Sequence, residues 1–145
     1  MLKLSKTIEY ALISINHINQ YDEDIPISVR IISDKYNIPF ELLAKILQKL
    51  SKAEILESIY GPRGGYKLND KYRILTLIQL IELLEGPFGI TDCLSDHHCE
   101  QISKCNIITP VEKINSQALA NGLMDLKYLS KKQIQIIEPA LKCEM

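Results

Sequence analysis

The 145-residue sequence lacks the features that mark several large classes of protein. It has no apolar run long enough to cross a bilayer, and residues 1–7 lack the uninterrupted apolar stretch of a secretory signal. It also has no nucleophile–base pair, phosphate-binding loop or dinucleotide fingerprint, and no internal repeat. We therefore expect a cytoplasmic protein that is not an enzyme and does not associate with membranes.

A strong excess of one charge is also missing, since the net charge is −1. The total hides an asymmetry between the two halves of the chain. Residues 1–74 carry eleven Lys and Arg and nine Asp and Glu, net +2, whereas residues 75–145 carry six and nine, net −3. We predict a first domain over residues 1–74 and a second over residues 75–145, with enough apolar residues for a compact core.

The apolar pattern of the first half predicts three helices. A helix over residues 4–20, with Ser5 as its cap, is expected to form one apolar face from Leu4, Ile8, Ala11, Leu12, Ile15 and Ile18. A second helix, over residues 28–36 and capped by Ser28, is expected to direct three side chains toward the core, those of Val29, Ile31 and Ile32. A third, over residues 39–53, is expected to bury Leu42, Leu43, Ile46, Leu47 and Leu50. His17 is expected on a helix surface or partly buried.

A tight turn and a hairpin complete the predicted fold of this half. Asn37 suits a left-handed conformation, and Pro39 suits the first turn of the third helix, so the second and third helices form a helix-turn-helix. Residues 55–68 read as two short strands around a glycine-rich turn. The prediction is a mainly α fold, a winged helix-turn-helix with a small β-hairpin wing.

This fold predicts binding to double-stranded DNA, with the third helix in the major groove and the wing along the backbone or minor groove. The candidate DNA-binding residues are Pro39, Phe40, Glu41, Lys45, Gln48 and Lys49 on the helix and Arg63 and Lys67 on the wing. Arg63 is the strongest of these because Gly61, Gly64 and Gly65 let the backbone approach a phosphate closely. A winged helix that serves only as a protein-interaction module is the alternative.

The second half combines a helix, a long loop and a further helix. Thr76 is expected to cap a helix that ends at Gly86, and residues 86–108 read as loop. Thr109, followed by Pro110 and Glu112, is expected to cap a helix reaching about residue 124. Ser130 is expected to cap a last short helix to Glu138.

Three cysteines with equal spacing, Cys93, Cys99 and Cys105, lie in the predicted loop. In a reducing compartment such cysteines are thiols, metal ligands or redox groups rather than disulfides. Thiolates are the preferred ligands of iron in sulphide clusters, so we predict an iron–sulphur cluster, [2Fe-2S] or [4Fe-4S]. The alternatives are a zinc site completed by His97 or His98, and a thiol sensor without metal. Cys143 is expected to be a thiol in a mobile tail.

Several of these segments together resemble one known family. The strings are Leu4-Ser-Lys-Thr-Ile-Glu-Tyr-Ala-Leu12, Ile46-Leu-Gln-Lys-Leu50, Gly61-Pro-Arg-Gly-Gly-Tyr66, Ile81-Glu-Leu-Leu-Glu-Gly-Pro87 and the triple cysteine. In this order they resemble the IscR/NsrR-type winged-helix iron–sulphur transcription regulators over nearly the whole chain. The segment Glu85–Cys93 looks closest to the branch that regulates iron–sulphur cluster assembly. The resemblance implies a homodimeric regulator with a long C-terminal dimerisation helix, a cluster in the cysteine loop and a pseudo-palindromic operator.

The resemblance also implies a fourth ligand. IscR-type members carry a histidine three residues after the last cysteine, where this sequence has Ile108. NsrR-type members instead take a carboxylate from the first helix of the partner subunit, and the matching position is Glu9. The predicted ligand set is therefore Cys93, Cys99 and Cys105 of one subunit with Glu9 of its partner. Whether the protein binds DNA with or without its cluster is left open.

Overall fold

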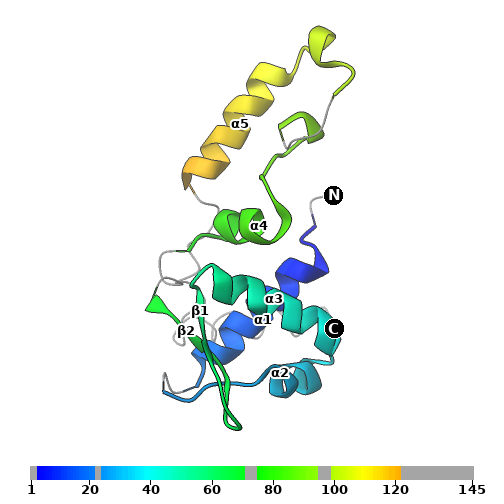
Figure 1. Ribbon diagram of the computed structural model, residues 1–145. Helices are drawn as coiled ribbons and strands as arrows, with labels where there is room; N and C mark the ends of the chain where they lie inside the picture. Colours follow the sequence, from blue (N-terminus) through cyan, green and yellow to red (C-terminus); the bar gives the residue numbers. More distant parts are fainter. Residues whose placement is uncertain (1–2, 22–23, 71–74, 95–98, 122–145) are drawn as a thin grey trace, which may run out of the picture. The chain divides into compact units, whose positions relative to one another are not determined.

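The structure, a computed structural model, describes residues 3–21, 24–70, 75–94 and 99–121, which form two compact units that divide between Leu75 and Thr76. The first unit contains the helices α1 (Lys6–Asn19), α2 (Val29–Tyr36) and α3 (Phe40–Lys52) and the strands β1 (Leu56–Ile59) and β2 (Gly65–Leu68) (Figure 1). The second unit contains the helices α4 (Leu77–Glu85) and α5 (Ile108–Asn121) and, between them, the 3₁₀ turns η2 (Asp92–Leu94) and η3 (Ile102–Lys104). No helix in these described stretches is both long and apolar enough to span a membrane.

The core of the first unit is made by apolar side chains of its three helices and β1. Helix α3 packs against α1, α2 and β1. The buried side chains at these contacts include Ile8, Ala11, Ile15, Ile32, Leu43, Ile46, Leu47, Leu50 and Leu56. Each fully buried Leu or Ile contributes about 1.5–3 kcal/mol relative to exposure. The helix-turn-helix is therefore held mainly by the buried face of α3.

The ends of these helices are fixed locally, as the sequence predicts. The Ser5 hydroxyl accepts from the Ile8 N–H at 3.3 Å, and the Ser28 hydroxyl accepts from the Ile31 N–H at 3.4 Å. Asn37 ends α2 in the left-handed conformation, with φ 54° and ψ 46°. Such caps satisfy backbone N–H groups that have no partner within the helix. The cap assignments and the left-handed turn residue are confirmed.

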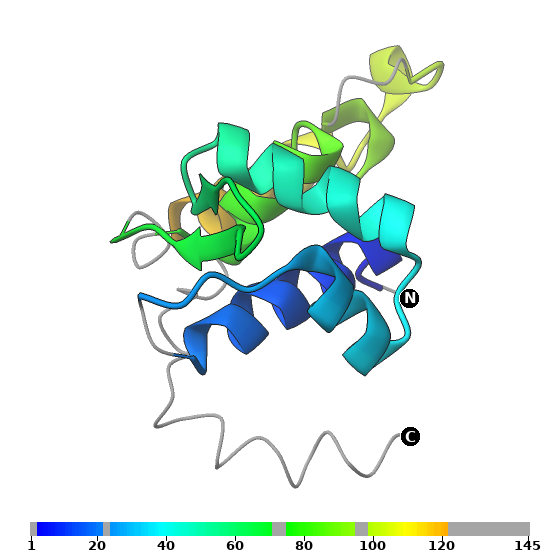
Figure 2. The same cartoon turned by 60° about the horizontal axis from the view of Figure 1, so that its bottom comes forward.

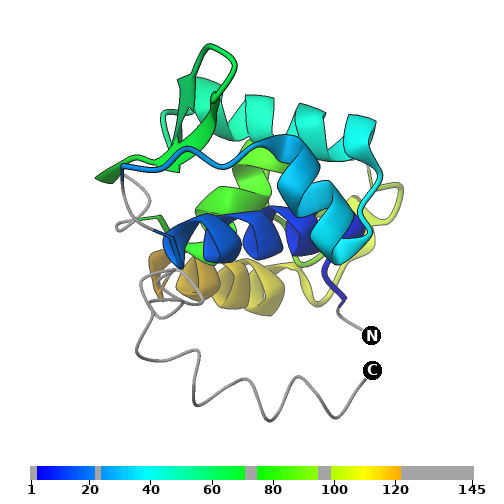
Figure 3. The ribbon, with the colours of Figure 1, turned by 90° about the horizontal axis from the view of Figure 1, so that it is seen from below.

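The hairpin is joined near its turn to the segment that precedes α2. Strands β1 and β2 are antiparallel, with Leu56 opposite Leu68. Tyr66 also pairs with Ile27: the Ile27 N–H donates to the Tyr66 carbonyl at 3.0 Å, and the Tyr66 N–H donates to the Ile27 carbonyl at 2.8 Å. Figure 3 shows the chain running along the hairpin before it enters α2. The wing and the start of the helix-turn-helix are therefore one hydrogen-bonded assembly.

Three side chains differ from their predicted burial. Ile31 and Leu42, expected to point inward, are 50% and 37% exposed. Their neighbours Ile32 and Leu43 are completely buried, so the buried strip on each helix is narrower than the apolar pattern suggests. His17, expected at most partly buried, is completely buried on α1.

In the second unit the cap of α4 is confirmed and the start of α5 is corrected. Thr76 and Gln79 form a reciprocal capping box, and Gly86 follows α4 with φ 97°. Helix α5 begins at Ile108, two residues before Pro110, the predicted first helical residue after a Thr109 cap; Pro110 is tolerated as the third residue, where an N–H has no partner within the helix. The predicted helix from Ser130 and the predicted mobile thiol of Cys143 lie outside the described residues.

Candidate metal centre and nucleic-acid interface

The segment that carries Cys93 is held by hydrogen bonds as it leaves α4. The Phe88 N–H donates to a carboxylate oxygen of Glu82 at 3.2 Å. Further along, the Ile90 N–H donates to the side-chain oxygen of Asn115 at 3.1 Å. Asn115 is buried on α5, so this bond joins the cysteine segment to that helix. Residues 88–90, which lead to Cys93, are therefore held by side chains of both neighbouring helices.

All three cysteines of the loop are free thiols and half-buried. Cys93 lies in the 3₁₀ turn η2, where its sulphur is 3.1 Å from the Thr91 hydroxyl oxygen. Cys99 and Cys105 flank the turn η3: the Ile102 N–H donates to the Cys99 carbonyl at 3.4 Å, and the Cys105 N–H donates to the Ile102 carbonyl at 3.5 Å. Half-buried free thiols in short turns remain accessible to a metal.

The chemistry of these donors fits an iron–sulphur cluster or a zinc ion, but the ligands are not already gathered. Within residues 3–21, 24–70, 75–94 and 99–121, no three His, Cys, Asp or Glu side chains converge into a metal site. Metal binding at such a segment is coupled to its folding, because the metal draws the ligands together. His97 and His98, the zinc-ligand candidates, lie outside the described residues.

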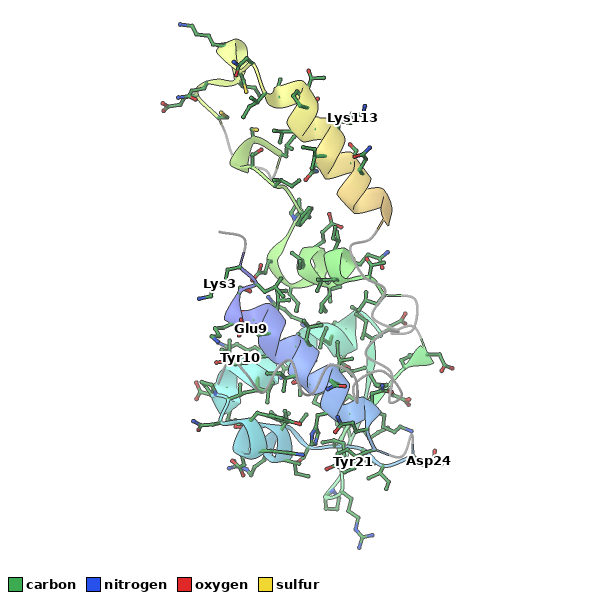
Figure 4. The ribbon with its side chains drawn as sticks, turned by 180° about the vertical axis from the view of Figure 1, so that it is seen from behind. Lys3, Glu9, Tyr10, Tyr21, Asp24 and Lys113 are labelled. Atoms are coloured by element: carbon green, nitrogen blue, oxygen red, sulfur yellow. The ribbon has the colours of Figure 1, made fainter. Side chains whose placement is uncertain are left out.

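Glu9, the predicted carboxylate ligand, lies near the start of α1. Figure 4 shows Lys3, Glu9 and Tyr10 around this end of the helix, with Tyr21 and Asp24 near its other end. One carboxylate oxygen of Glu9 is 2.8 Å from the Lys6 ammonium, and the Glu9 side chain is 35% exposed. The hydrogen bond and the charge of Glu9 raise the pKa of Lys6. The carboxylate is therefore solvent-accessible, and its partner is an exposed surface lysine.

The turn of the helix-turn-helix is fixed by two hydrogen bonds across it. The Ser33 hydroxyl donates to the Ile38 carbonyl at 2.7 Å, and the Ile38 N–H donates to the Ser33 carbonyl at 3.0 Å. Figure 2 shows this turn at one end of α3 and the hairpin at the other end. The predicted base-reading helix thus begins immediately after a rigid turn.

The predicted DNA-binding side chains of α3 lie on its solvent-facing side. Pro39, Phe40, Glu41, Lys45, Gln48 and Lys49 are all exposed. The opposite side of the same helix buries Leu43, Ile46, Leu47 and Leu50. A helix that buries one face and exposes a polar one next to a tight turn has the geometry that enters a major groove.

The wing exposes one cation and one aromatic ring. Arg63 is exposed at the tip, and Lys67 is half-buried on β2, opposite Glu57. The tip is closed by the Gly64 N–H, which donates to the Gly61 carbonyl at 3.0 Å. A side chain at Gly64 would meet the Ile59 carbonyl oxygen at 2.3 Å, so only glycine fits there. Tyr60, absent from the predicted set, is 93% exposed beside this tip.

Sequence reasoning also missed a buried polar contact between α1 and α2. The Nδ1 atom of His17 is 2.8 Å from the Tyr36 hydroxyl oxygen, and its Nε2 atom is buried without a hydrogen-bond partner in the described region. Burial, and secondarily the charge of Lys35, lower the pKa of His17. Because the two residues lie on different helices, no local sequence signal reveals the contact.

Comparison with known proteins identifies the family. Residues 4–126 match the Rrf2 family model, described as an iron-dependent transcriptional regulator. BadM of Rhodopseudomonas palustris, assigned to the helix-turn-helix transcriptional regulators, is 33% identical over 63% of this chain and 59% of its own length. The transcriptional repressor NsrR of Streptomyces coelicolor is 27% identical over 73% of this chain and 72% of its own.

A solved structure has a similar fold. CymR of B. subtilis, named the global cysteine regulator, superposes with a TM-score of 0.59 and 26% identity over 80% of this chain and 88% of its own. The match to the family model extends through both units, from α1 to beyond α5. The chain is therefore a member of the Rrf2 family of transcription regulators.

Proposed function

We propose that this protein is a homodimeric transcription regulator whose affinity for a pseudo-palindromic operator is controlled by an iron–sulphur cluster. The observation that carries the proposal is the set of three free, half-buried thiols, Cys93, Cys99 and Cys105, in one segment between α4 and α5. Three thiolates supply most of the donors of a cluster and leave one position open. The similarity to a family described as iron-dependent supports the same conclusion.

Glu9 of the partner subunit completes the ligand set in this proposal. Its carboxylate is accessible, with 35% of the side chain exposed, and it lies in the DNA-binding unit rather than in the cysteine unit. A carboxylate is a harder and more exchangeable ligand for iron than a thiolate. A cluster bound this way would supply a link between the two units that oxygen, nitric oxide or iron shortage can break.

The link explains how the cysteines can affect DNA binding. Glu9 is on α1, which packs against α3. A cluster bound by Glu9 would therefore bias the orientation of α3, the predicted base-reading helix. If the cluster prefers one arrangement by about 1–3 kcal/mol, operator affinity changes roughly 5- to 150-fold, and DNA changes cluster affinity by the same factor. Two symmetric subunits would read two half-sites of a palindrome.

A second candidate function is regulation by the thiols alone or by zinc. The observation in favour of a thiol sensor is that the three cysteines are free and that no three ligands converge among the residues that the structure describes, whereas a zinc site would need the same convergence as a cluster. In this case the cysteines would respond by oxidation or by holding zinc, and Glu9 would have no ligand role. The predicted DNA contacts would be unchanged.

Purification without oxygen separates the two functions. The cluster proposal predicts a brown protein that contains iron and sulphide and loses its visible absorption in air. A colourless preparation with stoichiometric zinc, or with no metal, would contradict it. Mössbauer spectra of the iron-loaded protein would then give the cluster type.

Two variants of the same ion pair test the ligand role of Glu9. Glu9→Ala and Lys6→Ala both remove the 2.8 Å contact between these residues, but only Glu9→Ala removes the carboxylate. We expect Glu9→Ala to shorten the lifetime of the cluster in air and Lys6→Ala to change it little. Equal lifetimes for Glu9→Ala and the unmodified protein would remove Glu9 from the ligand set. Circular dichroism of both variants controls for loss of helix.

A further inference from the structure

A cation from one helix of the helix-turn-helix is stacked on an aromatic ring of the other. The guanidinium carbon of Arg30 lies 5.0 Å from the centroid of the Phe40 ring. Arg30 is the second residue of α2, and Phe40 is the first residue of α3. Both side chains are exposed, and 44% of Phe40 is accessible to solvent.

Neither residue is explained by the packing of the first unit. Phe40 lies outside the core, although Leu43 and Leu47, three and seven positions further along its helix, are completely buried. In the described part of the chain Arg30 has no carboxylate partner, and its recorded contact is the Phe40 ring. The ring restricts the orientations of the guanidinium and leaves its N–H donors free.

The position of this pair matches the place where a helix-turn-helix meets base edges. The N-terminal residues of the second helix face the bases of the major groove. An aromatic side chain there is suited to contact the methyl group of thymine, and a guanidinium donates two N–H groups to O6 and N7 of guanine. Because the ring holds Arg30 beside the start of α3, both contacts would fall on neighbouring bases.

We propose that Arg30 and Phe40 form one base-reading element, in which Phe40 contacts a thymine methyl and Arg30 donates to an adjacent guanine. The inference rests on the proposed DNA interface and adds to it a specificity-determining residue from α2, outside the base-reading helix. Phe40 serves both as a contact and as the platform that positions Arg30.

The proposal differs measurably from a phosphate contact by Arg30. A phosphate contact depends on charge, so lysine would replace arginine, and all DNA sequences would be affected alike. A bidentate contact to guanine depends on the planar guanidinium, so lysine would lose discrimination at one base pair in each half-site.

The chain offers a matched control on the same helix. The Lys35 ammonium lies 5.5 Å from the centroid of the Tyr36 ring, at the other end of α2. This pair also joins an exposed cation to an aromatic ring. Lys35 and Tyr36 end α2, and neither is among the side chains that we place against base edges. Lys35→Ala therefore removes a similar interaction without touching the proposed reading element.

The experiment is selection from a pool of duplexes with about 30 random base pairs, enough for two half-sites one helical turn apart. The unmodified full chain is selected anaerobically, both with iron and sulphide loaded and after chelation, so that whichever form binds DNA is sampled. Arg30→Lys, Phe40→Leu and Lys35→Ala are then compared with it. Thermal unfolding of each variant confirms that it is folded.

The unmodified protein is expected to enrich a symmetric site that contains a thymine next to a guanine in each half. Arg30→Lys should lower discrimination at that guanine roughly 5- to 150-fold. Phe40→Leu should weaken selection of the thymine and the guanine together, whereas Lys35→Ala should leave the selected sequence unchanged.

Two results would overturn the proposal and distinguish it from the DNA interface on which it rests. If Arg30→Lys selects the same site with the same discrimination, Arg30 does not read a base, although the protein is still a DNA-binding regulator. If the unmodified protein enriches no sequence in either form, the proposed DNA interface fails and the reading element fails with it.

Discussion

Replacement of Gly65 by alanine is expected to separate the wing from the helix-turn-helix. Gly65 is the first residue of β2 and lies against the backbone that leads into α2. A Cβ atom at this position would be 2.4 Å from the carbonyl carbon and oxygen of Ile27 and 2.8 Å from the Ser28 nitrogen. These are backbone atoms, so they cannot rotate away as the end of a side chain could.

The expected loss of stability follows from the hydrogen bonds that the substitution breaks. Ile27 and Tyr66 exchange two backbone hydrogen bonds of 3.0 and 2.8 Å. Their loss corresponds to about 1–3 kcal/mol of unfolding free energy, at about 0.5–1.5 kcal/mol for each bond. In a chain of this size the midpoint of thermal unfolding should fall by roughly 2–12 °C. Because Ser28 caps α2, its displacement should also weaken operator binding.

Thermal unfolding and operator titration measure the two effects. Glu57→Ala is the control, because Glu57 is exposed on β1 of the same hairpin. We expect its unfolding midpoint to change little. A Gly65→Ala protein with an unchanged midpoint and unchanged operator affinity would refute the reasoning that the Ile27–Tyr66 pairing fixes the wing.

Three other variants test separate parts of the structure. The pKa of His17 is lowered from 6.5 by burial and by Lys35, so below about pH 6.5 the unfolded chain binds more protons than the folded one. The free energy of unfolding should therefore decrease on acidification, and His17→Gln should reduce that slope in urea titrations at several pH values. Thr76→Ala removes one half of the capping box of α4 and should cost about 0.5–2 kcal/mol in the same titrations at neutral pH; no change would mean that the cap is frayed in solution. Arg63→Ala should weaken operator binding and flatten its salt dependence, and an unchanged salt slope would exclude Arg63 as a phosphate contact.

Most of the fold could be predicted because its signals are local. Ser5, Ser28 and Thr76 each mark a helix start through a hydrogen bond to the third residue beyond them. Asn37 takes the left-handed conformation that its short polar side chain tolerates. Each of these features depends on residues within a few positions, so the sequence contains the information directly.

Features that depend on contacts between elements could not be predicted in the same way. Ile31 and Leu42 fit the apolar period of their helices, but the width of the buried strip depends on the shape of the neighbouring helices. His17 is buried with its Nδ1 atom 2.8 Å from the hydroxyl oxygen of Tyr36, nineteen positions away. The apolar periodicity of α1 does not reveal a partner that lies on another helix.

The candidate sites show the same division. The spacing of Cys93, Cys99 and Cys105 is visible in the sequence, and the structure adds that all three are free and half-buried. The stacking of Arg30 on Phe40 joins two helices across a turn and is visible only in three dimensions. The role of Glu9 depends on a second subunit, so it stays a prediction that the variants above can test.

The central claim is that a cluster on the three cysteines controls DNA binding. The most direct test is the operator affinity of one anaerobic preparation, measured with its cluster and again after removal of iron by chelation, with Cys99→Ser treated identically. The account predicts that affinity changes by roughly 5- to 150-fold on cluster removal in the unmodified protein. It also predicts no such change in Cys99→Ser. Equal affinities with and without the cluster in the unmodified protein would contradict it.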